Sequence, residues 1–286
     1  MSKKLKGYLL ARYTNMSNSY TCKRLVEEAE KLNIDLKTIG IHDVMVCGNE
    51  IYHKNKNLDK VDFIINRHKH GNLKDKLNAL GERSYNNINS FNIYLDKFLQ
   101  MENISTPNFL KAKYFLATAD KSFGEISDIL SEPFIAKGLN GSEGNEVFLI
   151  KNTEDLKSLE KSYPRDKEIL FQEFITTSIG RDIRLYAIKG DAVAAMLRKT
   201  EKDFRANFAL GASVEAYPID EKLRKIAEDI YRITKLDFVG IDLLFGENDL
   251  YFCEVNVMAG IRGIEKASGL NIAGKILESI RNDFNE

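Results

Sequence analysis

Apolar and polar residues follow each other along the first third of the chain in a pattern that predicts alternating strands and helices. Short apolar runs at residues 7–13, 36–42 and 61–67 predict buried strands. Between and after them, apolar residues recur at helical spacing over residues 20–32 and 73–82. Strands that alternate with helices are typical of a parallel α/β unit, so we expect the chain to begin with one.

The rest of the chain predicts an α+β pattern. A helix is expected to begin with Ser90 as its N-cap and to run over residues 91–103, until the sequence STP (105–107) ends it. The further expected elements are strands at 133–138, 146–151 and 168–175, a helix at 153–161, a hairpin that turns at 189–191, a helix at 220–235, a second hairpin at 239–256, and a closing helix from about residue 263. The fold class is therefore α/β, with α+β character after the first third.

The composition indicates a soluble protein without a preference for polyanionic partners. Of 286 residues, Lys and Arg number 42 together, as do Asp and Glu, so the formal net charge is zero. Nucleic acids and anionic membranes usually select basic charge, so neither is expected as a partner. No apolar run approaches membrane length. The cysteines Cys22, Cys47 and Cys253 lack metal-like spacing and suggest reduced thiols, so we expect a cytoplasmic protein.

The second hairpin places oxygen-bearing side chains on one strand face. Glu254 and Asn256 are two residues apart, so their side chains point to the same side of the sheet. Asp242 on the preceding strand lies opposite Glu254 if the turn is a three-residue loop at 247–249, whereas a four-residue loop would place the two carboxylates on opposite faces. Two carboxylates and an amide oxygen are hard ligands of the kind that holds Mg²⁺.

The alternative is that acidic residues near a turn are solvated surface residues. Glu247 and Asp249 fit this alternative, because they belong to the turn itself. Asp242 and Glu254 lie within the apolar strand sequences GIDLLF and YFCEVNV, where an unpaired carboxylate would be costly. Cys253 alternates to the other face and is expected in the core. The sequence therefore favours a metal site.

A glycine-containing loop follows Lys137 at the end of an expected strand. Gly138, Gly141 and Gly144 precede the next strand. A lysine beside such a loop suits a polyphosphate, because backbone N–H groups and an ammonium group can close over it. The loop lacks the GxxxxGK[ST] motif, and taken alone an ordinary flexible hairpin explains it equally well.

Cations and an amide gather further along the chain, at Arg181, Arg184, Arg198, Lys199, Arg205 and Asn207. Arg184 falls in an apolar strand, where it either pairs with an acid or receives anionic oxygens, and the sequence leaves both open. His68 and His70 have no acid or cysteine nearby to complete a zinc site, so an exposed loop is favoured. No GxSxG motif is present, and Cys22 and Cys47 have no evident base, so a protein nucleophile is not indicated.

Taken in order, these segments resemble the ATP-grasp superfamily, and within it the RimK-like carboxylate–amine ligases. The resemblance rests on the blocks DKFLQMENISTPNF, PFIAKGLNGSEG, QEFI, GRDIRLYAI, DFRAN, GIDLLF, CEVN and GIEKASGLNIAGKI. They extend from about residue 90 to the end, and residues 1–88 match only in α/β character. The resemblance implies an ATP-grasp fold with an N-terminal α/β domain (1–88), a subdomain with a phosphate-covering loop (89–175) and a subdomain with the magnesium site (176–286).

The resemblance also implies roles for individual residues. Lys97 and Lys137 would contact the phosphates of ATP, under a loop formed by residues 138–145. The adenine would be bound by the side chain of Gln172 and the backbone of Glu173, Phe174 and Ile175, and the ribose by Asp182. The γ-phosphate and the acceptor carboxylate would be held by Arg205, Asn207, Arg184 and Arg198. The ligands of Mg²⁺, with Mn²⁺ as an alternative ion, would be Asp242, Glu254 and Asn256.

The implied reaction activates a carboxylate as an acyl phosphate, releases ADP, and forms an amide when an amine attacks. The implied partners are a carboxylate substrate and an amino acid, with the carboxylate on a small molecule, a peptide or a carrier protein; self-association is common in the family. Glutamate addition to a protein or cofactor tail and peptide macrocyclisation are alternatives. A non-catalytic nucleotide-binding regulator is disfavoured, because it would be expected to have lost the metal ligands.

Three places depart from the family pattern. Residues 257–260 read VMAG where the family usually has small residues and a proline before glycine. Residues 209–212 read ALGA where a basic or polar residue often precedes two glycines, and Arg262 stands where an acidic or small residue is common. These positions are expected to border the acceptor site, so we expect an intact ATP site and an altered substrate pocket.

Overall fold

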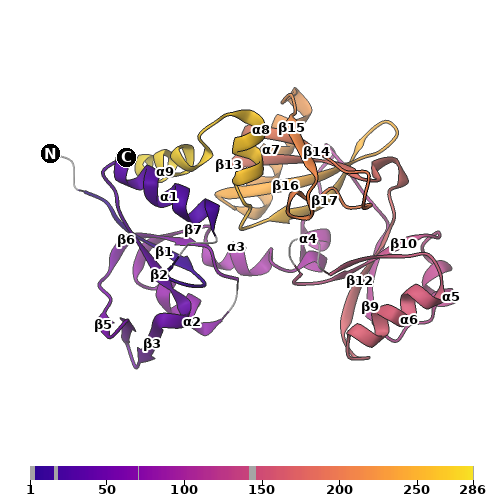
Figure 1. Cartoon of the computed structure of the whole chain (residues 1–286), viewed down its shortest axis with the longest axis horizontal. Helices are drawn as coiled ribbons and strands as arrows, with labels where there is room; N and C mark the ends of the chain where they lie inside the picture. Colours follow the sequence, from indigo (N-terminus) through magenta and orange to yellow (C-terminus); the bar gives the residue numbers. More distant parts are fainter. Residues whose placement is uncertain (1–3, 16–18, 70, 142–145, 286) are drawn as a thin grey trace.

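A computed structural model gives the fold and describes residues 4–15, 19–69, 71–141 and 146–285 (Figure 1). Over these residues the strands form four sheets. Figure 1 shows a sheet of N-terminal strands at one end of the molecule and the sheet that contains β9, β10 and β12 at the other, with the largest sheet between them.

The N-terminal sheet confirms the predicted parallel α/β unit. Its strands, in spatial order, are β2 (Asp35–Gly40), β1 (Lys6–Ala11), β6 (Val61–Asn66) and β7 (Gly81–Tyr85), all parallel. The 310 helix η1 (Ile41–Asp43) leads into a small sheet of β3 (Val44–Cys47), β4 (Glu50–His53) and β5 (Lys56–Asn57). The helix expected at 73–82 ends earlier, as α2 (Asn72–Asn78). Strand β7, which begins at Gly81, was not expected.

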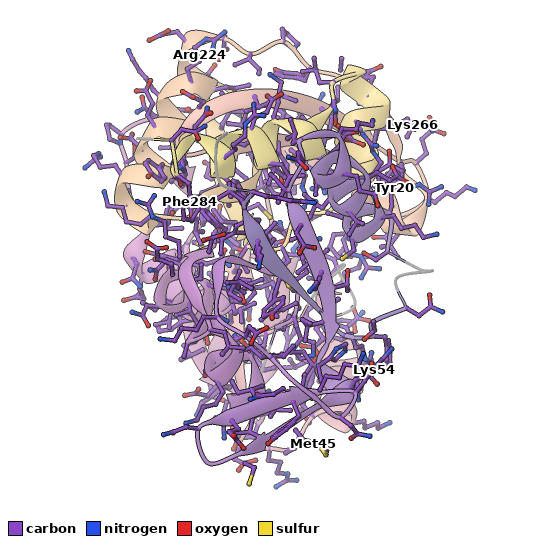
Figure 2. The ribbon with its side chains drawn as sticks, turned by 90° about the vertical axis from the view of Figure 1, so that its left-hand side faces the viewer. Tyr20, Met45, Lys54, Arg224, Lys266 and Phe284 are labelled. Carbon is purple, nitrogen blue, oxygen red and sulfur yellow. The ribbon has the colours of Figure 1, made fainter. Side chains whose placement is uncertain are left out.

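Helix α1 (Tyr20–Lys31) begins after Ser19, whose side chain accepts a hydrogen bond from the backbone N–H of Cys22. It lies beside the last helix of the chain. Figure 2 shows Tyr20 of α1 and Lys266, which lies in the helix Arg262–Ser268, on the same side of the molecule, far from Met45 on the small sheet.

Two helices replace the single helix expected at 91–103. They are α3 (Ile88–Ile93) and α4 (Lys97–Asn103), and Ser90 lies inside α3 rather than at its N-cap. The N-caps are Asn87 and Asp96. The Asp96 carboxylate accepts hydrogen bonds from two backbone N–H groups in the first turn of α4, which stabilises a new helix start at this point.

The sheet at the far end of the molecule is antiparallel, with the order β11 (Val147–Ile150), β10 (Phe134–Gly138), β12 (Glu168–Glu173) and β9 (Tyr114–Thr118). Helices α5 (Phe123–Ser127) and α6 (Thr153–Ser162) accompany it. Phe134 and Phe171 are fully buried, and their rings meet edge to face. The predicted strands at 133–138, 146–151 and 168–175 are confirmed, whereas β9 was not foreseen.

The largest sheet has the order β15 (Ser213–Ala216), β14 (Asp191–Lys199), β13 (Arg181–Ile188), β16 (Phe238–Phe245), β17 (Leu250–Asn256) and β8 (Leu110–Lys111). The other elements of this region are η2 (Thr176–Ser178), η3 (Phe208–Leu210) and α7 (Glu221–Thr234). Both predicted hairpins are present. The expected closing helix is divided into α8 (Arg262–Ser268) and α9 (Ile272–Asn282), because Gly269 ends α8 with a left-handed φ of 70°.

Buried amide side chains connect the parts of the molecule. Asn86 donates to the carbonyls of Phe238 (2.8 Å) and Val257 (3.0 Å) and accepts from the N–H of Phe238. Gln100 of α4 donates to the carbonyl of Val255 (3.0 Å) and accepts from its N–H (2.8 Å). Strands β16 and β17 are therefore held both by the N-terminal part and by α4.

Two elements cross the boundaries expected at residues 88 and 175. Strand β8 belongs to the largest sheet, and α9 packs against α1 of the N-terminal part. The division of the chain into residues 1–88, 89–175 and 176–286 therefore remains a proposal. A search of the described helices finds none with the length and apolar character that a membrane crossing requires.

Candidate active site

A single cavity of about 540 Å³ collects the residues that the sequence assigned to the site. Its walls come from α1, α4, the sheet of β9–β12 and the largest sheet. The assigned residues that line it are Lys97, Lys137, Gln172, Glu173, Phe174, Ile175, Asp182, Arg184, Arg198, Arg205, Asn207, Asp242, Glu254 and Asn256. The cavity thus contains all of them.

The register of β16 and β17 differs from the expected one, yet the two carboxylates still face each other. The turn is a four-residue loop, 246–249, which by counting would place Asp242 opposite Cys253. A β-bulge beside Asp242 adds Cys253 as an extra residue, so that Asp242 pairs with Glu254. A four-residue loop was expected to place the two carboxylates on opposite faces; the bulge prevents this, so that they still pair.

The bulge also changes the position of Cys253. We expected this residue in the core, but it lines the cavity, 4.0 Å from the Lys137 ammonium group. Simple alternation along the strand fails at the bulge, because the inserted residue breaks the period of two. Burial raises the pKa of the Cys253 thiol to about 11.

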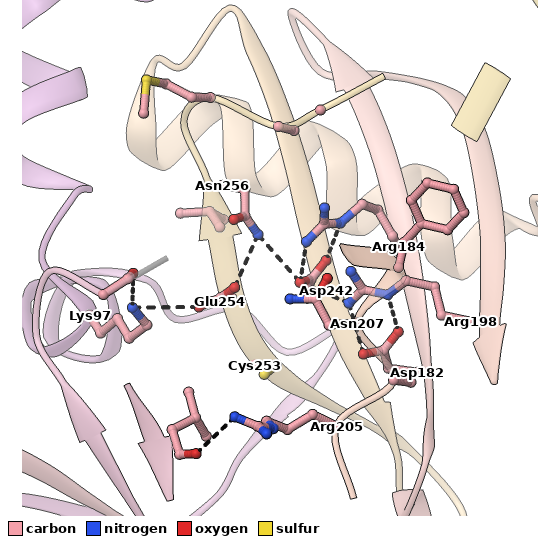
Figure 3. A pocket seen from close by; sticks show the side chains of 18 of the residues that line it. Lys97, Asp182, Arg184, Arg198, Arg205, Asn207, Asp242, Cys253, Glu254 and Asn256 are labelled. Atoms are coloured by element: carbon pink, nitrogen blue, oxygen red, sulfur yellow. Dashed lines mark hydrogen bonds and ion pairs between the residues drawn. The ribbon is translucent and has the colours of Figure 1, made fainter. Parts of the chain in front are cut away.

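The proposed metal ligands meet at their polar ends (Figure 3). The Asn256 amide nitrogen lies 3.3 Å from an oxygen of Asp242 and 3.2 Å from an oxygen of Glu254. Rotating the amide by half a turn would present its oxygen instead, and amide orientation follows the hydrogen-bond network. Two carboxylates and an amide oxygen suit a hard cation such as Mg²⁺. Among the described residues, no group of three His, Cys, Asp or Glu side chains offers another metal site.

Asp242 is held in its charged form by arginines. Arg184 makes a bidentate contact with it, at 2.6 and 2.5 Å, and Arg198 approaches to 2.9 Å. Burial by itself would raise the pKa of Asp242, but the two guanidinium groups outweigh burial and lower it. Of the two roles that the sequence left open for Arg184, the structure shows the pairing with an acid.

Asp182 shares Arg198 with Asp242. Two nitrogens of Arg198 contact the Asp182 carboxylate at 2.5 and 2.7 Å. Burial, assisted by the negative charge of Asp242, raises the pKa of Asp182 to about 6. Asp182, Arg198, Asp242 and Arg184 therefore form one chain of alternating charges along the cavity wall (Figure 3).

Two buried lysines face the cavity from α4 and β10. The Lys97 ammonium group donates to the carbonyl of Gly141 (2.6 Å) and lies 3.9 Å from Glu254. Lys97 and Lys137 are each only 7% exposed, so their positive charges are costly unless an anion is nearby. The expected phosphate-covering loop at 138–145 is described as far as Gly141, and residues 142–145 lie outside the described part of the chain.

The end of β12 and the segment after β14 complete the cavity. Gln172 is 4% exposed and directs its amide nitrogen toward the Met101 sulfur, at 3.9 Å. Arg205 contacts Asp203 at 3.0 and 2.7 Å and the carbonyl of Val147 at 3.3 Å. Arg205 therefore connects the largest sheet with β11 across the cavity.

Three further residues singled out in the sequence, Lys199, Arg181 and His68, were not assigned to the site, and of these three only Arg181 lines the cavity. Lys199 pairs with Glu215, at 2.6 Å, on the exposed side of β14 and β15. Arg181 lines the cavity and donates to the carbonyl of Thr177. His68 lies in the segment after β6 and is half-buried rather than exposed, and His70 is outside the described residues.

The sequence did not identify the N-terminal side of the cavity, which includes Ser19, Tyr20, Thr21, Arg67 and Lys69. These residues follow strands β1 and β6. The rule that ligands bind at the carboxyl ends of parallel strands could have indicated them.

The chain is similar to proteins whose family is known. The model of the RimK-like ATP-grasp domain matches residues 92–280. A probable alpha-L-glutamate ligase of Rhodopirellula baltica is 27% identical over 93% of this chain and 70% of its own length. The ribosomal protein bS6–L-glutamate ligase of Escherichia fergusonii is 28% identical over 91% of both chains.

A solved structure extends the comparison to the whole fold. The ATP-grasp ligase PsnB, complexed with a minimal precursor, superposes with a TM-score of 0.70 over 98% of both chains, at 15% identity. At this identity the likeness shows the fold, which is the ATP-grasp fold. The match over residues 92–280 shows the family: the chain belongs to the RimK-like ATP-grasp family and is an ATP-grasp ligase.

Proposed function

We propose that the protein joins a carboxylate to the amine of an amino acid, using ATP and Mg²⁺ and releasing ADP and phosphate. The observation that carries the proposal is the meeting of Asp242, Glu254 and Asn256 in one cavity with Lys97 and Lys137. The oxygen donors suit Mg²⁺, and the buried ammonium groups suit phosphate oxygens.

The nucleotide would lie between β12 and β17. Phe174 and Ile175 line the cavity where the backbone leaves β12, which suits the adenine, and Gln172 would contribute its side chain there. Asp182 would bind the ribose. Glu173 would contribute its backbone alone, because its carboxylate accepts from the N–H of Lys113 at 3.1 Å.

The reaction would proceed in two steps. A carboxylate oxygen of the substrate attacks the γ-phosphorus of ATP, the bond to ADP breaks, and an acyl phosphate forms. The amine nitrogen then attacks the acyl carbon and loses a proton, and phosphate leaves. Arg184, Arg205 and Asn207 would hold the anionic groups that must approach each other, which lowers their repulsion. Bound Mg²⁺ would neutralise phosphate charge.

The test is an assay of nucleotide products. Purified protein is incubated with ATP, Mg²⁺, pooled amino acids and pooled carboxylates, and ADP and AMP are measured separately. ADP that depends on both substrates, and that disappears with EDTA, supports the proposal. AMP with pyrophosphate would contradict the acyl-phosphate route, and the absence of turnover with every pool would favour a nucleotide-binding regulator.

Glutamate addition to a protein is the second candidate, because the relative in Escherichia fergusonii is named as a ligase of ribosomal protein bS6 and L-glutamate. Incorporation of labelled glutamate into a protein would support it.

We also propose a cytoplasmic site of action, where the three cysteines, all free in the structure, would stay reduced.

A further inference from the structure

The segment after Asn256 forms the part of the cavity that departs from the family pattern. Residues 257–260 and 262–263 line the cavity here, and none of them is acidic. Residues 206–208, at the start of η3, line the same cavity, as do Arg67 and Tyr20 from the N-terminal part. This region adjoins the metal residues directly in the sequence, so a substrate bound in it would lie next to the reacting phosphate.

Several polar side chains in this region already have partners in the protein. An Arg67 nitrogen donates to the carbonyl of Ala259 at 3.1 Å. The Tyr20 hydroxyl donates to the Glu265 carboxylate at 2.8 Å. These contacts hold the 257–263 segment against the N-terminal part and leave their groups less available to a ligand.

Arg262 differs from these residues. It is exposed, it lines the cavity, and within the described part of the chain its guanidinium makes no ion pair or hydrogen bond. A guanidinium group in such a position can bind a carboxylate through two parallel hydrogen bonds.

Apolar side chains line the same cavity as Arg262. A side chain at Gly263 would lie 3.4 Å from a ring carbon of Phe208 and 3.3 Å from the Met196 methyl group, so both side chains pack closely beside the residue that follows Arg262. Met258 lines the cavity four residues earlier. Phenylalanine and methionine side chains provide a contact surface that adapts to apolar groups.

We propose that the amine substrate is an α-amino acid with an apolar side chain. Its carboxylate binds Arg262, its side chain packs on Phe208 and Met258, and its amine faces the activated carboxylate. A glutamate side chain would instead place a second carboxylate against this apolar surface, at a cost in desolvation. This inference rests on the proposed ligase function, because it names the amine used in the second step.

Binding can be measured separately from turnover. Isothermal titration calorimetry of the full chain, with Mg²⁺ and a non-hydrolysable ATP analogue, is carried out with leucine, methionine, phenylalanine and glutamate. At least one apolar amino acid is expected to bind about 10-fold or more tightly than glutamate. Equal or tighter binding of glutamate, or no binding of any of the four, overturns the inference.

Three variants locate the site. Arg262→Gln is expected to weaken binding of the apolar amino acid by about 10- to 100-fold while leaving the affinity for the ATP analogue unchanged. Met258→Lys is expected to reduce the preference for apolar over acidic side chains. Leu210→Lys is the matched control, since Leu210 is 46% exposed in the same 310 helix as Phe208 and lies outside the cavity wall. An unchanged affinity in Arg262→Gln would overturn the assignment.

The outcomes separate this inference from the proposed function. If leucine binds at Arg262 but no carboxylate yields ADP, the subsite stands and the ligase proposal fails. If ADP forms with glutamate and not with apolar amino acids, the ligase proposal stands and the inference fails.

Discussion

Arg184 and Asp242 lie directly opposite each other on strands β13 and β16, and two guanidinium nitrogens meet the two carboxylate oxygens at 2.6 and 2.5 Å. Asp242 is only 3% exposed, so its charge depends on this contact and on Arg198. The same pairing that stabilises the strands keeps the carboxylate ionised, which is the form that binds a cation.

Replacing Arg184 with Met is expected to lower the free energy of unfolding by about 3 kcal/mol, because a buried charge loses its main partner. Urea denaturation measures the change. Arg224→Met, on the exposed face of α7, is the control and should change stability by less than about 0.5 kcal/mol. Equal effects of the two substitutions would contradict a stabilising role for the ion pair.

Glu254→Gln is expected to reduce kcat about 100-fold or more, because the isosteric amide removes the charge that would bind Mg²⁺. The fold should persist, since Glu254 is partly exposed to the cavity, and its contact with Asn256 can be kept by an amide oxygen. Steady-state ADP release and thermal unfolding are compared with those of Glu247→Gln, in the turn of the same hairpin. Full activity in Glu254→Gln would show that the metal assignment is wrong.

Cys253 should report on nucleotide binding. In a Cys47→Ser background the remaining thiols are the buried Cys22 and Cys253, which lines the cavity beside Lys137. We expect alkylation of Cys253 to be slow at neutral pH and to accelerate toward pH 11, because the thiolate reacts and burial raises the pKa to about 11. ATP with Mg²⁺ should slow labelling, as measured by mass spectrometry of peptides. Labelling that is indifferent to ATP would place the nucleotide elsewhere.

Asp237 should destabilise the protein at neutral pH. Burial raises its pKa from 3.8 to about 6, so the folded state takes up a proton more readily than the unfolded state. The resulting stability is present below about pH 4 and is lost as the pH rises through 6. Asp237→Asn is therefore expected to be more stable than the natural sequence at pH 7, by about 3 kcal/mol, and about equally stable at pH 4.

Asp283 provides a control of opposite sign. It lies near Asp237, since both residues line a second hollow. Burial would raise its pKa, but hydrogen bonds from Lys189 and Tyr85 outweigh burial and lower it. Its contribution is present above pH 3.8 and is lost at lower pH, so Asp283→Asn should be less stable than the natural sequence at pH 7. Urea denaturation at both pH values measures both variants. If both variants change the free energy of unfolding in the same direction at pH 7, the surroundings described for Asp237 and Asp283 are contradicted.

The meeting of the proposed metal ligands was predictable in part, because strand periodicity places Glu254 and Asn256 on one face whatever the length of the turn. Asp242 pairs with Glu254 as expected, but not through the three-residue turn from which the pairing was inferred. The turn has four residues rather than three, and an extra residue at Cys253 restores the pairing. No local property of YFCEVN distinguishes a bulge from a regular strand, because the bulge is a property of the pairing between β17 and the neighbouring strand β16.

Helix boundaries show the same limit. The apolar pattern of residues 91–103 is continuous, but Asp96 accepts two N–H groups and starts α4 there. The N-terminal wall of the cavity depends on tertiary contacts such as Arg67 with Ala259, which are 192 residues apart. The sequence blocks predicted the residues proposed to bind ATP, whereas the N-terminal wall of the cavity depends on the packing of distant segments.

Helix α4 sets a fixed spacing within the site. Lys97 contacts the carbonyl of Gly141, and Gln100, one turn later, contacts the backbone of Val255, which lies between the proposed metal ligands Glu254 and Asn256. The rise of three helical residues, about 4.5 Å, therefore fixes the distance along α4 between its contact with Gly141 and its contact with strand β17. An insertion between residues 97 and 100 would rotate the two contacts by about 100° relative to each other, so the length of this turn should tolerate less variation than its exposed side chains.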